Sequence, residues 1–479
     1  MLLLGSRLKL VLAASCLAVL QIAAKPLQIP VVDGVIGGVP SVTPPVHQEA
    51  VGDQPVSSAI VPGKLRYVQN SGVCETTPGV FQASGYADLT ATQSMWFWFF
   101  EARNNPSKAP VSIWLNGGPG SSSMIGLFQE NGPCRINTDQ RTVSLNPFSW
   151  NNNANMLYID QPIGVGFSHG DLQVGTTAQA AAAVWNMLQI FFADPKFSSF
   201  AGNEFAIWTE SYGGHYGPGF SAYILQQNAA IRAGTIPGII INLQTLGVGN
   251  GLTDPLSQYA GYMLYAASNP YHPTVSASTI TAANTSFYQA NTGCKALIQS
   301  CYSTGATATC TRAQQFCNSA VLSRLQGNND IYDVRQGLDD PYPPDITTLM
   351  TSSSFTSKIG AESTWQITNN QVYNNFANTG DWMHNSAIDL EMVINAGIRT
   401  VIYDGDADFI LNFKGVELMV NNLQTKFTGT IAQQAFTNYT VSGRQAGLVK
   451  NAGTFSYIRI FGAGHEVPAY NFTGLVDYP

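Results

Sequence analysis

The segment Phe205–Leu225 constrains the fold of this chain more than any other. Its first residues, Phe205–Trp208, are apolar and predict a buried strand, which stops abruptly before Ser211. Gly213 and Gly214 follow, and then a stretch with the character of a helix. A serine on such a sharp strand-to-helix turn is lifted out of the sheet edge, and the N–H groups of the helix start face negative charge that develops beside it. The segment therefore predicts a nucleophilic serine.

The serine motif is imperfect when taken by itself. The pattern Gly-x-Ser-x-Gly has glycine at the position that Thr209 occupies here, and a β-branched side chain opposes close packing of the strand against the helix. Serine beside glycine is also common in ordinary turns. The interpretation of Ser211 as a nucleophile therefore depends on the rest of the chain.

The composition is that of an exported protein with a large core. Of the 479 residues, 45% are hydrophobic and 11% are charged, and the net charge is −7. Without a basic patch, binding to nucleic acid is not expected. Residues 1–24 predict a signal peptide, with Arg7 and Lys9 before the apolar run Leu10–Leu20 and small residues at Ala23-Ala24. That run is short for a bilayer span and no later run is long enough, so we expect no stable membrane anchor.

Sequons and cysteines also indicate the secretory pathway, and we expect a secreted or a vacuolar, lysosome-like location. Asn284, Asn438 and Asn471 each begin an Asn-x-Ser/Thr triplet and are candidate glycosylation sites. Of seven cysteines, six remain once Cys16 is removed with the signal peptide. An even number in an exported chain indicates disulfides.

The cysteine spacing suggests how the six would pair. Two pairs have members seven residues apart, which places each pair on one face of a helix. If those helices fold back on each other at residues 303–305, the expected disulfides are Cys301–Cys310 and Cys294–Cys317, which leaves Cys74–Cys134. Zinc binding by the four clustered cysteines is the alternative. Our prediction is disulfides, with no metal and no cofactor.

Strands and helices alternate along most of the chain. After a Pro-, Val- and Gly-rich stretch at residues 25–60, which suggests an arm or propeptide, buried strands are predicted at Ser94–Phe100, Val111–Leu115 and Asn155–Asp160, and a long helix at Ala178–Ala193. This alternation predicts an α/β fold with a mostly parallel central sheet and helices on both faces.

The middle of the chain has a different texture. From about residue 253 to 381 it is polar and helical, lacks buried strands and holds the clustered cysteines. We expect a mainly helical cap domain over 253–381, inserted between two parts of the core at 61–252 and 382–479.

A serine nucleophile needs a base and an acid that orients the base. The predicted strand Arg399–Tyr403 is followed by three candidate acids, Asp404, Asp406 and Asp408, and chemistry alone does not choose among them. His465, in a glycine-rich loop, is the only histidine after these aspartates. It is therefore the candidate base.

Two further segments have competing interpretations. His215 could also serve as the base, but it lies one helical turn after Ser211 and points away, so packing is its expected role. Gly117 and Gly118 follow a strand, and paired glycines there free a backbone N–H to face an oxyanion. A phosphate-binding loop is the rival interpretation, but no lysine stands in the required place, and an ordinary turn would be favoured in isolation.

Six motifs occur in order between about residues 64 and 470: Asn116–Ser122, Asp160–Ser168, Glu210–Tyr216, Gly249–Gly251, Gly405–Asn412 and Gly464–Pro468. Together they resemble the serine carboxypeptidase family, whose members have the α/β-hydrolase fold. The combination is far more specific than any single motif.

The resemblance implies roles for individual residues. Asp408 would be the acid of the triad, and the N–H groups of Gly118 and Tyr212 would form the oxyanion hole. The residues that would bind the C-terminal carboxylate of a substrate are Asn116, Glu130 and Glu210, with Trp114 nearby.

Two carboxyl groups that face a carboxylate repel each other when both are ionised. They must share protons, so their apparent pKa values rise, and in the protonated form they donate hydrogen bonds to the substrate. We therefore expect a serine carboxypeptidase that releases C-terminal amino acids from peptides with a free carboxylate, best at acidic pH.

The chain departs from the family pattern in three places. Ser121 stands where the family usually has Cys, so that disulfide is missing, and Leu411 stands where some members have Cys, so sensitivity to thiol reagents is not expected. The chain also ends 14 residues after His465, short of the family's usual further helix, whose loss would expose core. An acyltransferase of the same family and an inactive binding or protective member are the alternative functions, and the oligomeric state is open, with a homodimer as one option.

Overall fold

The computed structural model describes residue 28, residues 31–32 and 35–36, and residues 60–470. The predicted signal peptide, most of the N-terminal arm, Asn471 and the C-terminal end lie outside these residues. Within the arm, β1 (Val31–Val32) pairs antiparallel with β2 (Val35–Ile36), and Gln28 Nε2 donates to the carbonyl of Ala435 at 2.7 Å.

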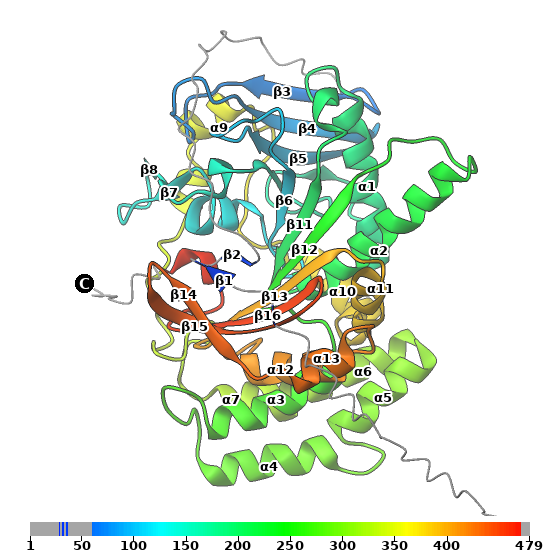
Figure 1. The fold of residues 1–479 in the computed structure, drawn as a ribbon, viewed down its shortest axis with the longest axis vertical. Helices are drawn as coiled ribbons and strands as arrows, with labels where there is room; N and C mark the ends of the chain where they lie inside the picture. The colour runs from blue at the N-terminus through cyan, green and yellow to red at the C-terminus, as the bar shows by residue number, and fades with distance from the viewer. Residues whose placement is uncertain (1–27, 29–30, 33–34, 37–59, 471–479) are drawn as a thin grey trace, which may run out of the picture.

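A twelve-stranded sheet runs through the molecule (Figure 1), in the order β14-β15-β16-β13-β12-β11-β6-β9-β5-β4-β3, with β10 paired to β5. The central strands from β16 to β9 are parallel, and both flanks are antiparallel. The predicted parallel sheet is thus the centre of a mixed one. The strands are β3 (Leu65–Gln69), β4 (Gln82–Thr90), β5 (Gln93–Phe100), β6 (Val111–Leu115), β9 (Asn155–Ile159), β10 (His169–Gly170), β11 (Phe205–Glu210), β12 (Leu243–Gly249), β13 (Arg399–Gly405), β14 (Thr437–Val441), β15 (Arg444–Ala452) and β16 (Phe455–Ile460).

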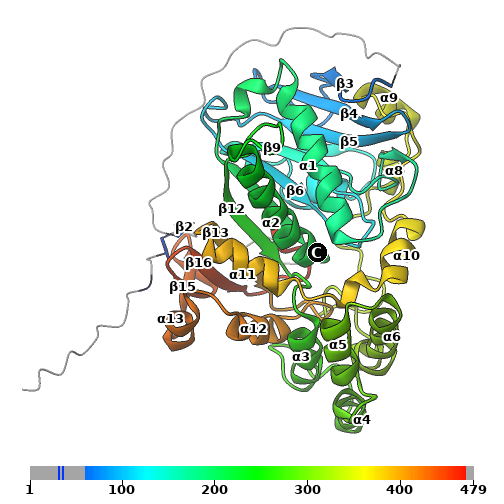
Figure 2. The ribbon, with the colours of Figure 1, turned by 90° about the vertical axis from the view of Figure 1, so that its right-hand side faces the viewer.

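The sheet is covered on both faces, as the apolar strand β5 requires. Alternate residues of a strand point to opposite faces. Phe97 and Phe99 contact Phe191 of α1 (Thr177–Ala193). Trp98 contacts Phe355 of α9 (Ser353–Ile359) on the other face. The first face is covered by α1 (Thr177–Ala193), α2 (Gly213–Arg232) and α11 (Ala387–Asn395) (Figure 2). Two further helices, α12 (Phe413–Asn422) and α13 (Thr428–Gln433), follow β13 and precede β14 along the chain.

The predicted insertion is helical but divided. Between β12 and β13, residues 250–398 are all described and contain no strand. Helices α8 and α9 leave the other inserted helices and cross to the sheet beside β4 (Figure 1), where Ser84 Oγ donates to the carbonyl of Ile359 at 2.8 Å. The inserted helices are α3 (Pro255–Ala267), α4 (Ala277–Tyr288), α5 (Cys294–Thr304), α6 (Thr307–Cys317), α7 (Ser323–Gln326), α8 (Thr347–Met350), α9 (Ser353–Ile359) and α10 (Asn370–Thr379). In the described part of the chain, no helix has the length and apolar character that a membrane crossing needs.

The structure pairs the cysteines in the nested arrangement that their spacing predicts. The disulfides are Cys301–Cys310, Cys294–Cys317 and Cys74–Cys134. Helix α5 ends at Gly305, whose φ of 60° lies in the left-handed region that glycine tolerates, and the chain folds back there. His384 lies beside Cys301 and Cys310, but their sulfur atoms are bonded to each other and so offer no thiolate to zinc.

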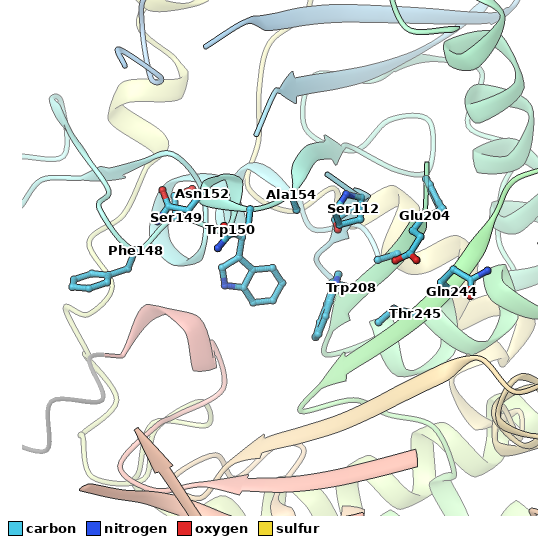
Figure 3. Close-up of a pocket in the computed structure, with 14 residues that line it drawn as sticks. Ser112, Phe148, Ser149, Trp150, Asn152, Ala154, Glu204, Trp208, Gln244 and Thr245 are labelled. Carbon is cyan, nitrogen blue, oxygen red and sulfur yellow. The ribbon is translucent and has the colours of Figure 1, made fainter. Parts of the chain in front are cut away.

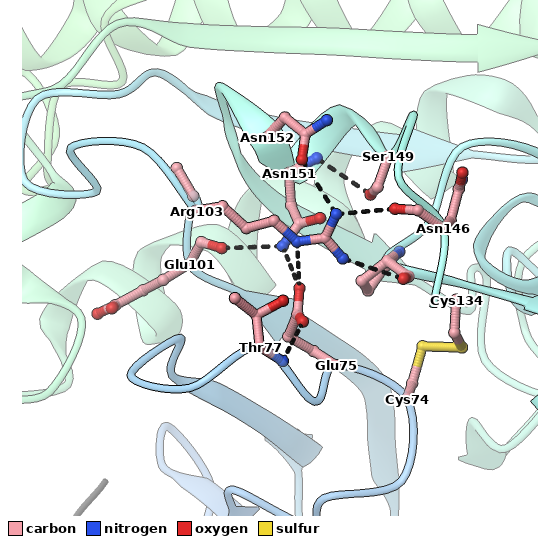
Figure 4. A network of polar contacts seen from close by, with 12 residues as sticks. Cys74, Glu75, Thr77, Glu101, Arg103, Cys134, Asn146, Ser149, Asn151 and Asn152 are labelled. Carbon is pink, nitrogen blue, oxygen red and sulfur yellow. Dashed lines mark hydrogen bonds and ion pairs between the residues drawn. A yellow bond between two sulfur atoms is a disulfide. The ribbon is translucent and has the colours of Figure 1, made fainter. Parts of the chain in front are cut away.

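A buried polar network next to the Cys74–Cys134 disulfide anchors the loop that follows residue 130 (Figure 4). The carboxylate of Glu75 accepts from Arg103 Nε at 2.9 Å and from Asn151 Nδ2 at 2.7 Å. Arg103 also donates to the carbonyl of Asn146 at 2.8 Å. Because the Glu75 side chain is fully buried and paired, the network joins the start of the core to this loop firmly.

The close contact between α3 and α12 gives a test of how the insertion is held. A Cβ on Gly261 would lie 2.3 Å from the Cα of Gly415, so Gly261→Ala forces the two helices apart. We expect it to lower the free energy of unfolding by about 1–3 kcal/mol, seen as a lower thermal midpoint. Gly429→Ala, in α13 with no atom within 4 Å of its Cβ, is the matched control and should leave the midpoint unchanged or raise it.

Candidate active site

The carboxyl ends of β11, β12 and β13 meet at one edge of the sheet. Glu210 pairs with Gly249, and Gly249 pairs with Tyr403. The residues that follow these strands, Ser211 and Asn250 among them, are therefore brought together, as is usual for the functional edge of a parallel sheet.

Ser211 occupies a strained turn between β11 and α2. Its φ is 65°, which an L-residue other than glycine rarely adopts. Its N–H donates to the carbonyl of Gly249 at 3.1 Å, and its carbonyl accepts from the N–H groups of Gly214 and Leu252, each at 2.9 Å. These bonds hold the serine in the conformation predicted for the strand-to-helix turn.

Two glycines of α2 explain why Thr209 is tolerated. A Cβ on Gly213 would lie 2.5 Å from Thr209 Cβ, and one on Gly217 would lie 2.9 Å from Thr209 Oγ1. The hydroxyl donates to the carbonyl of Gly213 at 2.9 Å. The space that glycine usually leaves on the strand is thus left on the helix instead, and the strand and helix stay close.

The structure brings Asp408 and His465 into contact and leaves the other two aspartates elsewhere. His465 Nδ1 lies 2.8 Å from Asp408 Oδ2. Asp406 instead accepts from Tyr271 at 2.6 Å and from the N–H of Gly462 at 2.9 Å, and Asp404 is fully buried within β13. Burial raises the pKa of Asp408, whereas His465 and several hydrogen bonds lower it.

Asn250 links the serine turn to this acid, a role that the sequence did not reveal. Its Nδ2 donates to Asp408 Oδ2 at 2.7 Å, and its Oδ1 accepts from the N–H of Gly405 at 2.9 Å. Because the preceding residue, Gly249, holds Ser211, a continuous set of bonds runs from Ser211 to Asp408. Its position in the motif Gly249–Gly251 was the only signal for it.

His215 is occupied elsewhere, as its expected packing role requires. Its Nδ1 bonds with the hydroxyl of Ser386, and its Nε2 lies 3.1 Å from the carbonyl of Trp382. Burial lowers the pKa of His215 to about 4, so the ring is neutral.

The glycine loop after β6 lies directly against the serine turn. A Cβ on Gly117 would lie 2.2 Å from the backbone N of Tyr212, so only glycine allows this approach. Among the described residues, neither the N–H of Gly118 nor that of Tyr212 has a protein acceptor. The Tyr212 hydroxyl donates to Asp381 at 2.6 Å, which fixes the residue from its other end.

Asp160 binds the end of the glycine loop, at Ser122 and Ser123. Its carboxylate accepts from Ser122 Oγ at 2.6 Å and from the N–H groups of Ser123 and Phe167 at 2.9 and 3.0 Å. Burial outweighs the effect of these donors, which lower the pKa of Asp160, and the net pKa is raised to about 6. The loop after β6 and the loop after β9 are therefore tied to one side chain.

Beside the serine turn, Asn116 joins two buried carboxyl groups. Its Nδ2 donates to Glu130 at 3.1 Å and to Glu210 at 3.2 Å. Its Oδ1 accepts from Trp114 Nε1 at 2.7 Å and from the N–H of Gly126 at 3.0 Å, so the orientation of the amide is fixed. Trp114 is fully buried and holds Asn116 instead of facing a ligand.

The titrations of the two buried glutamates are linked. Burial raises the pKa of both, and the Glu130–Glu210 bond raises that of Glu210 and lowers that of Glu130. Two buried carboxyl groups that are coupled in this way share protons, so the pair is not fully ionised at acidic pH. Within the described part of the chain, the Oε2 atom of each is buried without a hydrogen-bond partner, so each is open to a bound group.

Comparison with known proteins agrees with this geometry. A model of the serine carboxypeptidase family matches residues 72–474. The chain belongs to this family. It is 45% identical over 408 residues to carboxypeptidase S1 of Penicillium janthinellum, with 84% of this chain and 95% of that protein covered. It is 37% identical over 405 residues to carboxypeptidase Y of Schizosaccharomyces pombe, with 81% and 40% covered.

A solved structure supports the α/β-hydrolase fold. Kex1Δp, a prohormone-processing carboxypeptidase from Saccharomyces cerevisiae, matches with a TM-score of 0.65 and 24% identity, over 81% of this chain and 88% of that one. At that identity the likeness shows the fold alone.

In this serine carboxypeptidase a third carboxyl group, Glu466, joins the cluster. Burial raises its pKa well above the usual range, and the charges of Glu130, Asp340 and Asp330 raise it further. Its Oε2 atom is buried and has no hydrogen-bond partner among residues 60–470. The residue follows His465 directly, but a linear motif gives no sign that its carboxyl group interacts with that of Glu130.

The positions of the two missing family cysteines are filled by other contacts. Ser121 Oγ lies 2.9 Å from Thr368 Oγ1, and the two residues also form a β-bridge. Leu411 is buried, and its N–H donates to Asp408 at 3.3 Å.

A groove of about 730 Å³ is lined by residues other than those of the triad (Figure 3). The rings of Trp150 and Trp208, 4.9 Å apart, form its centre, and Phe148 is 77% exposed at one end. None of Ser211, Asp408 and His465 lines it. The groove is therefore not the catalytic site.

The accommodation of Thr209 can be tested by a double-mutant cycle. Gly213→Ala places a methyl group against Thr209 and should distort the serine turn, lowering kcat by about tenfold or more and stability by about 1–3 kcal/mol. Adding Thr209→Gly removes the clash and should restore most of both, whereas Thr209→Gly alone serves as the reference. A double variant as impaired in kcat and thermal midpoint as Gly213→Ala alone would contradict this explanation.

Proposed function

We propose that the chain cleaves the last peptide bond of a substrate through an acyl-enzyme. Ser211 Oγ attacks the scissile carbonyl, and His465 Nε2 takes its proton while Asp408 holds the ring through Nδ1. The N–H groups of Gly118 and Tyr212 stabilise the oxyanion. His465 then protonates the departing amine, the C-terminal amino acid leaves, and a water activated by the same histidine hydrolyses the acyl-enzyme.

The cluster of Asn116, Glu130 and Glu210 is the observation that supports an exopeptidase. Glu210 directly precedes Ser211, so the cluster lies about one residue from the bond that is cut. Protonated carboxyls, held in place by Asn116, donate to a substrate's terminal carboxylate, whereas ionised ones would repel it. An acyl-transfer reaction to an alcohol has no need of this recognition, which favours the hydrolase over the acyltransferase.

Export through the secretory pathway is part of the proposal. Three disulfides are formed in the described chain, and the sequon residues Asn284 and Asn438 are exposed, as glycosylation requires. The third sequon, at Asn471, lies outside the described residues.

The triad assignment predicts that Ser211→Ala removes activity almost completely. A fall in kcat of at least about 10³-fold is expected, because no other side chain replaces the nucleophile. A peptidyl phosphonate should label the unaltered protein at Ser211, as read by mass spectrometry of the digested protein. Failure to label would favour an inactive binding or protective function.

Carboxylate recognition predicts that KM depends on pH. Burial raises the pKa values of Glu130 and Glu210, so their protonated forms persist to higher pH than those of exposed glutamates. As pH rises through those values the cluster loses protons, and KM for a blocked dipeptide with a free carboxylate should rise. The corresponding C-terminal amide should show no such rise.

The matched variant carries Glu130→Gln and Glu210→Gln together. Two neutral amides keep hydrogen-bond donors in place but do not titrate, so KM for the free acid should stay nearly flat from pH 4 to 8. A KM that still rises with pH as in the unaltered enzyme would assign the titration to another group.

A further inference from the structure

Arg135 connects the carboxyl cluster to the loop that carries His465. It lies in β7 (Cys134–Ile136), next to the disulfide to Cys74. Its Nη2 donates to the carbonyl of Glu130 at 2.7 Å and to that of Pro468 at 2.8 Å, and its Nη1 donates to that of Ala469 at 3.2 Å. One guanidinium thus bridges two segments that are more than 300 residues apart in sequence.

The fork geometry of arginine suits this bridge. A guanidinium presents several N–H donors in fixed directions, whereas an ammonium is a point charge on a flexible stem. Residues 467–469 form a short 3₁₀ turn directly after His465 and Glu466, so holding Pro468 and Ala469 restrains the approach of the histidine loop to Glu130. The disulfide at Cys134 fixes the strand from which Arg135 acts.

The bridge also places a permanent positive charge near groups that are almost all acidic. Burial raises the pKa of Glu130, while its bonds to Glu210 and Asn116, together with His465 and Arg135, lower it. The remaining titratable groups that interact with Glu130 or with its neighbour Glu466 are Tyr158, Tyr332, Tyr342, Tyr403, Asp340 and Asp330. None of these carries a permanent positive charge, so Arg135 counters the repulsion among the carboxyls.

We propose that Arg135 is a positioning residue for the reaction: it holds Glu130 and the His465 loop in one arrangement and sets the upper pH limit of C-terminal carboxylate recognition. The inference rests on the proposed function, because that limit has meaning only if the cluster binds the substrate's carboxylate. Arg135 itself contacts neither the nucleophile nor the base.

The two parts of this role have separate signatures. Losing the hydrogen bonds loosens the site at every pH. Losing the charge disfavours the ionised carboxyls, so the cluster keeps its protons to higher pH and the alkaline fall of peptidase activity moves upward. We call this fall the alkaline limb of the pH profile. A residue that only stabilised the fold would lower activity without moving the alkaline limb.

Arg135→Gln and Arg135→Lys separate the two effects. For a blocked dipeptide with a free carboxylate, Arg135→Gln should lower kcat/KM about tenfold at the optimum and move the alkaline limb up by about 0.5–1 pH unit. Arg135→Lys keeps the charge but loses the fork, so kcat/KM should fall about threefold or more with the limb in place. Arg141→Gln, at an exposed position a few residues along, makes the same charge change and should do neither.

The outcomes distinguish this inference from the proposed function. If the unaltered enzyme cleaves the free acid but Arg135→Gln leaves the limb where it was, the inference is overturned and the function stands. If Arg135→Gln does not fold, judged by thermal midpoint and phosphonate labelling, an Arg135→Lys variant with unaltered kcat/KM would overturn it equally. An unaltered enzyme with no preference for a free carboxylate over the amide would instead remove the proposed function.

Discussion

The left-handed backbone at Ser211 is the constraint on which the rest of the site depends. Because β11 turns there at φ 65°, three consecutive residues point to three different places. Glu210 faces Asn116, the Ser211 side chain leaves the sheet edge, and the N–H of Tyr212 has no acceptor among the residues that the structure describes. Such strain persists only when its surroundings determine it, and here the bonds to Gly249, Gly214 and Leu252 do so.

Sequence alone predicted the parts of the site that lie within motifs and missed those that depend on contact between them. The serine and the glycine loop were identified because each follows a predicted strand, and the candidate base because it is the only histidine after the three aspartates. Chemistry alone left three aspartates as candidates for the acid. The resemblance to the serine carboxypeptidase family favoured Asp408, and the structure places Asp408 in contact with His465. Thr209 does not keep the strand and helix apart, as its branched side chain had suggested. The compensating glycines lie on α2, and no linear pattern relates them to the strand.

For the fold, too, the sequence predicted local elements but not all of the contacts between them. Apolar strands and the nested cysteines marked the α/β core and the helical insertion, because periodicity and spacing are local properties. The division of that insertion was not predicted: α8 and α9 cross to the sheet, and nothing in a short polar helix says which surface it will cover. Asn250 and Glu466 were missed for the same reason, since their roles come from partners distant in sequence.

The three carboxyls beside His465 should be considered as one titrating system. The charge of Glu130 raises the pKa of Glu466, and the charges of Glu130 and Glu466 both raise the pKa of Glu210. The charge state of each carboxyl therefore changes the free energy of ionising the others. Protons then leave the cluster over a wider pH range than a single group would give, and no step belongs to one residue. Since Glu466 adjoins the base, the recognition of the substrate's carboxylate and the electrostatic surroundings of His465 change together. A peptide whose carboxylate enters the cluster adds another negative charge, which raises the protonation of the glutamates further and so strengthens the hydrogen bonds that hold it.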